Sequence, residues 1–248
     1  MSQAFASIEH MFDTGLMGVG APLTLAVDRR LDVLPALESV LPDGLQRGTI
    51  VGVSGTGALS LALALVAGAT SGDTWAAMVG CEDLCLAAAE GMGVPLHRLV
   101  TVSRPDRSQW STVVGALLDS FEIVLVAPTS RVGTSDARRL RHRARERGSV
   151  LVDVSRVWPD AHDLSLTITD SQWSGLGDGH GFLEARRVEI RVDGRRGVMG
   201  RTVPLWLPGP DGIPEAIDQN ISNHAGGDIE SIVGVSPSAQ PVPLRSVG

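Results

Sequence analysis

The sequence predicts an α/β domain whose central sheet is mainly parallel, with antiparallel strands added at its C-terminal edge. Two observations lead to this prediction. Between residues 49 and 154, short apolar blocks alternate with helix-like segments, which is typical of parallel strands covered on both faces. After Val157, apolar and polar residues alternate instead, which is typical of antiparallel strands with one exposed face.

The elements follow one another with short connections. A first helix is expected at 31–41, ahead of a Pro-Asp-Gly turn. Parallel strands are expected at 49–54, 75–79, 99–102, 122–126 and 149–154, and helices at 59–69, 82–92, 108–120 and 136–147. Antiparallel strands are expected at 164–169, 185–192 and 202–207, and Asp193-Gly194 signals a hairpin between the last two.

These elements divide the chain into three segments. Residues 1–30 form an N-terminal arm and residues 31–207 form the core. Residues 208–248 are expected to be a disordered tail, because proline, glycine, serine and acidic residues leave too little apolar surface for a core. The tail keeps two apolar clusters: Ile213, Ile217 and Ile221, and Ile229, Ile232 and Val233. Two interpretations remain, a segment that orders on a partner's groove and a spacer.

Composition excludes several classes of protein. No run of about 18 apolar residues occurs and no secretory signal is recognisable, so a cytoplasmic protein without membrane contact is expected. The net charge of −7 argues against a surface that coats nucleic acid indiscriminately, although a local basic patch stays possible. Every basic residue is arginine. Cys81 and Cys85, four residues apart, are expected on one helix face and fit neither a disulfide framework nor a zinc site.

A glycine-rich turn follows the first strand of the core, where a phosphate-binding loop of pattern G-x-x-x-x-G-K-[ST] would lie. The positions are filled by Gly52, Gly55, Gly57, Ala58, Leu59 and Ser60. Alanine stands where lysine would neutralise phosphate, leucine stands where a hydroxyl would hold magnesium, and the serine comes one residue late. We therefore expect no cofactor, no metal and no hydrolysis. The turn is either a tight strand-to-helix connection or a residual anion site.

A family resemblance extends over residues 31–200. The stretches 41–51, 61–66, 75–79, 82–89 and 93–99, together with the turn, resemble the core of RecA-like proteins. The resemblance is closest to the ImuA-type branch in its actinobacterial form, on Trp173, the stretch 175–179, Arg186 and Arg187.

The resemblance also allows a check of two acidic positions. It places the magnesium-binding aspartate at Ala127-Pro128, so this acid is missing, and the water-activating acid near Glu82. A helix N-terminal residue is the alternative role for Glu82. The connections 129–135 and 156–163 match the DNA-binding loops and are short for that purpose.

What the resemblance implies is a non-catalytic accessory protein of DNA-damage-induced mutagenesis and translesion synthesis in the SOS response. Its partner would be an ImuB-like, polymerase-related protein and, through it, an error-prone C-family DNA polymerase. Such a protein would be cytoplasmic and associated with the nucleoid after damage. The alternatives are an ATPase completed in trans and a recombination mediator that binds single-stranded DNA, for which 4% aromatic residues supply few stacking platforms.

One helix carries six arginines between positions 138 and 147. Arg138, Arg141 and Arg145 share one face by their spacing and are candidates for contact with nucleic acid or an acidic partner. The alternative is a solvated outer face, with Leu140 and Ala144 pointing inward. The six histidines show neither metal-ligand spacing nor a carboxylate partner set.

Overall fold

The computed structural model describes residues 30–217, except for 83, 156, 176–180 and 195–199. None of the helices within these residues is long and apolar enough to cross a membrane.

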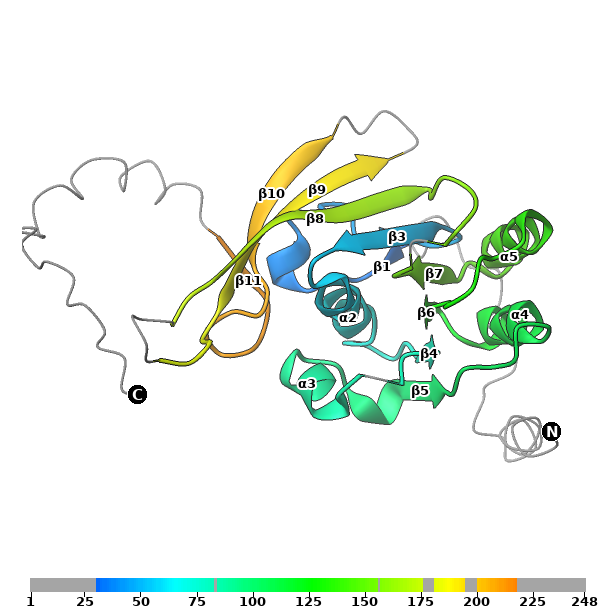
Figure 1. Ribbon diagram of the computed structural model, residues 1–248, viewed down its shortest axis with the longest axis horizontal. Coiled ribbons are helices and arrows are strands. Elements are labelled where there is room, and N and C mark those ends of the chain that lie inside the picture. Colours follow the sequence, from blue (N-terminus) through cyan, green and yellow to red (C-terminus); the bar gives the residue numbers. More distant parts are fainter. Residues whose placement is uncertain (1–29, 83, 156, 176–180, 195–199, 218–248) are drawn as a thin grey trace, which may run out of the picture. The chain divides into compact units, whose positions relative to one another are not determined.

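A single large sheet organises the described chain (Figure 1). The strand order is β11-β10-β9-β8-β3-β7-β6-β4-β5, and the six strands from β8 to β5 run parallel. The parallel strands are β3 (Ile50–Gly55), β4 (Ala76–Val79), β5 (Leu99–Val102), β6 (Ile123–Val126), β7 (Val150–Asp153) and β8 (Leu164–Trp173). The predicted α/β class with a mainly parallel sheet is confirmed.

Antiparallel strands extend the sheet beyond β8, as predicted. They are β9 (Arg186–Gly194), β10 (Arg201–Trp206) and β11 (Glu215–Ala216). The strand at 164–169 was also expected to be antiparallel, but it is part of β8, which pairs parallel with β3 and antiparallel only with β9. The hairpin between β9 and β10 is present, but Asp193 and Gly194 do not form its turn. They belong to β9 and pair with Ser165 and Leu164, because the pairing between β8 and β9 extends to the first residue of β8.

Helices cover both faces of the sheet (Figure 1). On one face lie α2 (Ala58–Ala69) and α3 (Leu86–Gly91), and on the other lie α4 (Trp110–Ser120) and α5 (Thr134–Arg147). The side chains of successive strand residues point to opposite faces, so the strands from β3 to β7 each supply apolar side chains to two clusters, whereas β8 supplies them to one. This explains why β4 and β6, in the middle of the parallel part, are entirely apolar in sequence.

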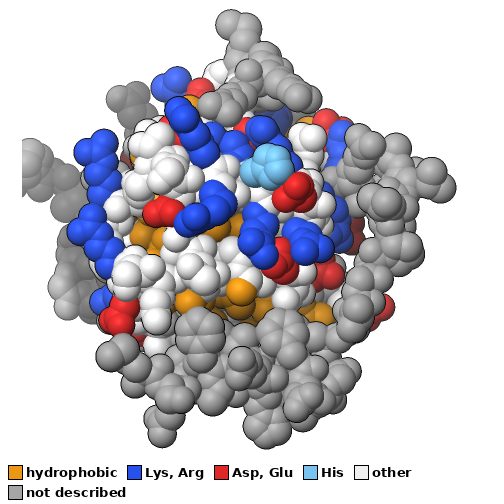
Figure 2. Space-filling view, turned by 90° about the vertical axis from the view of Figure 1, so that its right-hand side faces the viewer, with side chains coloured by type: hydrophobic (Ala, Val, Ile, Leu, Met, Phe, Trp, Pro, Cys, Tyr) orange, Lys and Arg blue, Asp and Glu red, His pale blue; other side chains and the backbone are white. Residues whose placement is uncertain are grey.

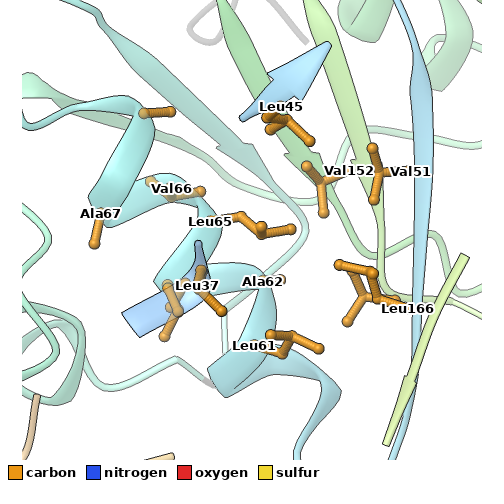
Figure 3. Packing of buried hydrophobic residues seen from close by; sticks show 14 of the residues in the cluster. Leu37, Leu45, Val51, Leu61, Ala62, Leu65, Val66, Ala67, Val152 and Leu166 are labelled. Carbon is orange, nitrogen blue, oxygen red and sulfur yellow. The ribbon is translucent and has the colours of Figure 1, made fainter. Parts of the chain in front are cut away.

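The larger cluster forms between α2 and the sheet (Figure 3). Leu61, Ala62 and Leu65 of α2 lie toward Val51 and Leu166 of neighbouring strands, and all five are completely buried. Every residue of α2 from Leu61 to Ala69 is buried, so this helix is apolar all round and lacks an exposed stripe.

The helix predicted at 31–41 is not present. Its place is taken by the two-residue strand β1 (Arg30–Leu31), the 3₁₀ turn η2 (Pro35–Leu37) and further turns. β1 pairs with β2 (Leu45–Gln46) instead of continuing into a helix. Pro35 stands at the first position of the short helical turn, where proline is tolerated, and prevents a helix from running through it.

The ordered core also continues past residue 207, where the tail was expected to begin. β11 pairs with the end of β10, and the Pro208 carbonyl accepts a hydrogen bond from the Arg186 amide. These backbone pairings compensate for the low apolar content of this stretch. Residues 218–248, which hold Ile221, Ile229, Ile232 and Val233, lie outside the described residues, as does most of the predicted arm.

Candidate functional site

The turn from β3 into α2 has the backbone of a tight strand-to-helix connection. Gly55 and Gly57 adopt φ values of 97° and 86°, in the left-handed region that favours glycine. A Cβ on Gly55 would lie 2.2 Å from the Ile168 carbonyl oxygen of β8, so no larger residue fits without moving the backbone. Both glycines are therefore required by the turn itself.

The residues that replace the lysine and the hydroxyl belong to the protein interior. Ala58 and Leu59 are half-buried and pack against the cluster beneath α2. The Ser54 hydroxyl, just before the turn, lies 3.1 Å from the Thr167 hydroxyl of β8. A leucine that packs on the core offers no oxygen to a magnesium ion.

A buried arginine lies against the turn. A Cβ on Gly57 would approach a guanidinium nitrogen of Arg186 to 2.2 Å. Arg186 is 5% exposed; its Nε donates to the Leu207 carbonyl at 2.7 Å, and its guanidinium lies over the Trp173 ring, 5.4 Å from the centroid. Its Nη2 has no hydrogen-bond partner among the described residues, and burial lowers the pKa of the guanidinium. The cation beside this turn therefore comes from β9.

Gly52, the first glycine of the pattern, has a different neighbour. It lies inside β3, and a Cβ there would meet the His162 ring at 2.3 Å. His162 Nε2 lies 3.1 Å from a carboxylate oxygen of Asp153, which is completely buried at the end of β7 and also accepts a hydrogen bond from the Ser155 hydroxyl at 2.7 Å. The expectation that no histidine has a carboxylate partner is wrong for His162.

This histidine belongs to a crossover in which the described residues, 154–155 and 157–163, form no helix. The chain passes from β7 to the parallel strand β8 through ten residues, 154–163, which run over the face that carries α5. The His162 ring packs on Trp158, with the centroids 6.2 Å apart, and the Val132 amide donates to the Val157 carbonyl. The two connections matched to DNA-binding loops therefore touch each other at this point.

The acidic positions of the RecA-like pattern do not meet at the turn. β6 ends at Val126 and is followed by Ala127. Glu82 precedes α3 rather than opening it, which corrects the helix predicted at 82–92. Its carboxylate accepts a hydrogen bond from the Arg104 amide at 2.6 Å and pairs with the Arg104 guanidinium at 3.5 Å.

The two cysteines do not share a helix face. Cys85 is the exposed N-cap of α3, and Cys81 lies before it. Burial raises the pKa of the Cys81 thiol to about 11, against a smaller opposing effect of Arg104. No cluster of three or more potential metal ligands is found among the described residues.

The arginines of α5 do not form one exposed stripe. Arg138 is exposed, but Arg141 is 9% exposed and points into the protein, so its prediction as a contact residue is not supported. Its Nη2 donates to the Ala161 carbonyl at 2.7 Å, and its guanidinium pairs with Asp160 at 3.5 Å. Arg141 thus binds the crossover between β7 and β8. The spacing of arginines along α5 could not predict this contact, because the crossover is a separate segment. Arg145 is exposed and pairs with Asp163 at 3.4 Å.

The remaining arginines of α5 are partly neutralised. Arg143 and Arg147 both bind the Asp119 carboxylate of α4, and Arg139 pairs with Asp136. Leu140 and Ala144 are buried, as the solvated-face alternative proposed. Figure 2 shows the face that carries α4 and α5, on which arginine side chains gather with acidic ones between them.

Two tail residues fall within the described chain. Ile213 is 48% exposed and Ile217 is half-buried at the end of the described residues.

Comparisons with known proteins agree with this architecture. Residues 39–160 match the family model described as the MT3502 N-terminal domain. The chain is 33% identical over 146 residues to the uncharacterized protein Rv3395c of Mycobacterium tuberculosis, and the match spans 58% of this chain and 61% of that relative. The crystal structure of the RadB recombinase aligns with a TM-score of 0.53 at 18% identity, covering 74% of this chain and 97% of that one. The chain has a RecA-like fold.

Proposed function

We propose that this RecA-like chain is a non-catalytic accessory protein of DNA-damage-induced mutagenesis and translesion synthesis. It would bind an ImuB-like, polymerase-related partner and, through it, an error-prone C-family DNA polymerase. Its contribution would be a binding surface and not the hydrolysis of a nucleotide.

One observation carries the non-catalytic part of the proposal. Phosphoryl transfer in this fold depends on a lysine, a magnesium-binding hydroxyl and an aspartate around the loop. Here Ala58 and Leu59 pack on the core, Ala127 follows β6, and the cation at the turn is Arg186, buried beside Gly57. The chain contains no lysine at all. These residues support a protein that keeps the scaffold of the fold without its chemistry.

The partner is inferred from resemblance. Trp173, Arg186 and Arg187 are among the residues that resemble the ImuA-type branch, and in the structure the first two contact each other. The match to the MT3502 N-terminal domain covers 39–160, which includes the turn and α5.

A nucleotide-binding test examines the non-catalytic part. A ligand present at 100 times its dissociation constant adds ~2.7 kcal/mol to stability, so millimolar ATP with magnesium should leave the melting temperature unchanged if the site is absent. The matched control is the double variant Ala58→Lys/Leu59→Thr, which restores the loop pattern in the same scaffold. A magnesium-dependent rise in the melting temperature of the unsubstituted chain, or ATP turnover by it, would overturn the proposal in favour of an ATPase.

A co-purification test examines the adaptor part. The tagged full chain, isolated from cells with and without DNA damage, should carry a polymerase-related protein after damage. Failure to recover such a partner, with mass spectrometry as the readout, would refute the adaptor role.

A recombination mediator is the second candidate, because the solved structure reported above is a recombinase. It predicts salt-dependent binding of an oligo-dT single strand, which loses affinity steeply between about 50 and 200 mM salt. Few aromatic side chains are available for base stacking: of the described ones, Trp75, Trp173 and Phe182 are the large exposed rings. Tight oligo-dT binding at physiological salt would favour this candidate.

A further inference from the structure

A hollow in the surface lies at the opposite end of the strands from the β3–α2 turn. It forms where β3 and β8 begin and β9 ends, and its volume is about 1030 Å³. Four arginines from separate parts of the chain line it together with two aspartates: Arg30, Arg47, Arg145, Arg201, Asp43 and Asp163. Its lining carries more positive than negative groups, in a chain whose net charge is −7.

The two aspartates are already engaged. Asp43 pairs with Arg30 at 2.9 Å, and Asp163 pairs with Arg145 at 3.4 Å. Asp163 also accepts a hydrogen bond from the Ile50 amide at 3.0 Å, which fixes it at the start of β3.

The other two arginines have no carboxylate within 4.0 Å among the described residues. Arg201 donates to the Val40 carbonyl at 2.6 Å, and Arg47 has a buried Nε without a hydrogen-bond partner in the described chain. A buried donor of a charged group that has no partner destabilises the fold. An anionic group entering the hollow would offset this cost.

The rest of the lining favours an acidic peptide over single-stranded nucleic acid as the anionic ligand. Pro42 and Leu164 supply an apolar part, and none of the aromatic side chains in the described part of the chain lines the hollow. Single-stranded nucleic acid is usually held by stacking of bases on aromatic rings, for which this hollow has no counterpart. Guanidinium groups around an apolar part instead match a peptide that carries both carboxylates and aliphatic side chains.

We propose that this hollow binds an acidic, partly apolar peptide segment of a protein partner. Arg47 and Arg201 would receive its carboxylates, and Pro42 and Leu164 would contact its aliphatic side chains. The proposal rests on the adaptor function proposed above, for which it names the surface that receives the partner.

A peptide selection tests the proposal on the full chain. A display library of random peptides of about twelve residues should yield sequences in which Asp or Glu alternates with Leu, Ile or Val. A fluorescent copy of a selected peptide should bind, by anisotropy, at least about tenfold more weakly to Arg47→Gln, because this variant loses a hydrogen bond between two charged groups. Arg138→Gln, which removes the same charge outside the hollow, should bind as the unsubstituted chain does. Arg145→Gln provides a second variant at the rim if Arg47→Gln does not fold.

Three results would overturn the proposal: selection without acidic enrichment, equal peptide affinity in the Arg47→Gln and Arg138→Gln variants, or loss of oligo-dT binding in Arg47→Gln with peptide binding unchanged. The adaptor function is tested separately. Recovery of the polymerase-related partner by Arg47→Gln would refute this surface and leave the adaptor function standing. Peptide binding through Arg47 by a chain that recovers no such partner would refute the adaptor function alone.

Discussion

Arg141 gives the most direct test of how the helix-less crossover is held. Replacing it by alanine removes the hydrogen bond to the Ala161 carbonyl at 2.7 Å and the pairing with Asp160 at 3.5 Å. A hydrogen bond from a charged donor contributes about 1.5 to 3 kcal/mol, and breaking a buried ion pair costs about 3 to 5 kcal/mol. The side chain of Asp160 keeps 24% of its surface exposed, so the ion pair is only partly buried. We therefore expect Arg141→Ala to lower the free energy of unfolding by about 2 to 4 kcal/mol, less than the loss of a fully buried pair would.

Urea unfolding followed by circular dichroism measures this difference, and the melting temperature should fall by about 2 to 4 °C for each kcal/mol lost. Arg138→Ala is the matched control on the same helix. Because Arg138 is exposed, its loss should change stability by less than about 0.5 kcal/mol. Equal stability of the two variants would refute the argument that Arg141 holds residues 154–163 in place.

Three further predictions follow from local environments. Gly57→Ala should destabilise the protein by at least about 1 kcal/mol, because φ at this position is 86° and a guanidinium occupies the space of the new methyl group. In the same unfolding experiment Gly72→Ala should be nearly neutral, because nothing lies within 4 Å of the added Cβ. Iodoacetamide at pH 8 should modify Cys85 well before Cys81, whose pKa burial raises to about 11; equal labelling of both, read by mass spectrometry, would contradict this. Burial alone would raise the pKa of Asp119, but two neighbouring arginines lower it overall, so its stabilisation is present above the unfolded pKa and is lost as pH falls through the folded value. Asp119→Asn should therefore flatten the stability profile at pH values below the ordinary carboxyl pKa of 3.8, and an unchanged profile would refute this assignment.

The parallel core was predictable because its signals are local. Each strand is a short apolar block and each long helix follows within a few residues, so β3 through β7 lie close to their predicted places. The errors occur where local preference gives way to other constraints. Pro35 confines the segment after β1 to a 3₁₀ turn, and α3 begins only at Leu86, because Glu82 binds the Arg104 amide in place of opening the helix.

The site was less predictable because its contacts join distant parts of the chain. Arg186 lies 129 positions after Gly57, and the fold of β9 against β8 brings them together. The partner of His162 is nine residues away, but the crossover and the end of β7 must both form before the two side chains meet. Helical spacing placed Arg141 correctly on α5, yet the burial of that position depends on the loop packed above it.

The crowded surroundings of Gly52 and Gly57 show that packing alone can require glycine at both positions of the motif. A histidine ring takes up the space beside the first, and a guanidinium takes up the space beside the second. Any side chain at these positions would be penalised by packing alone, whether or not an ancestor of the chain ever held a nucleotide. Selection for folding alone can thus maintain the glycines of such a motif, independently of any catalytic activity. In proteins built this way, the information about activity lies in the residues between and after the glycines.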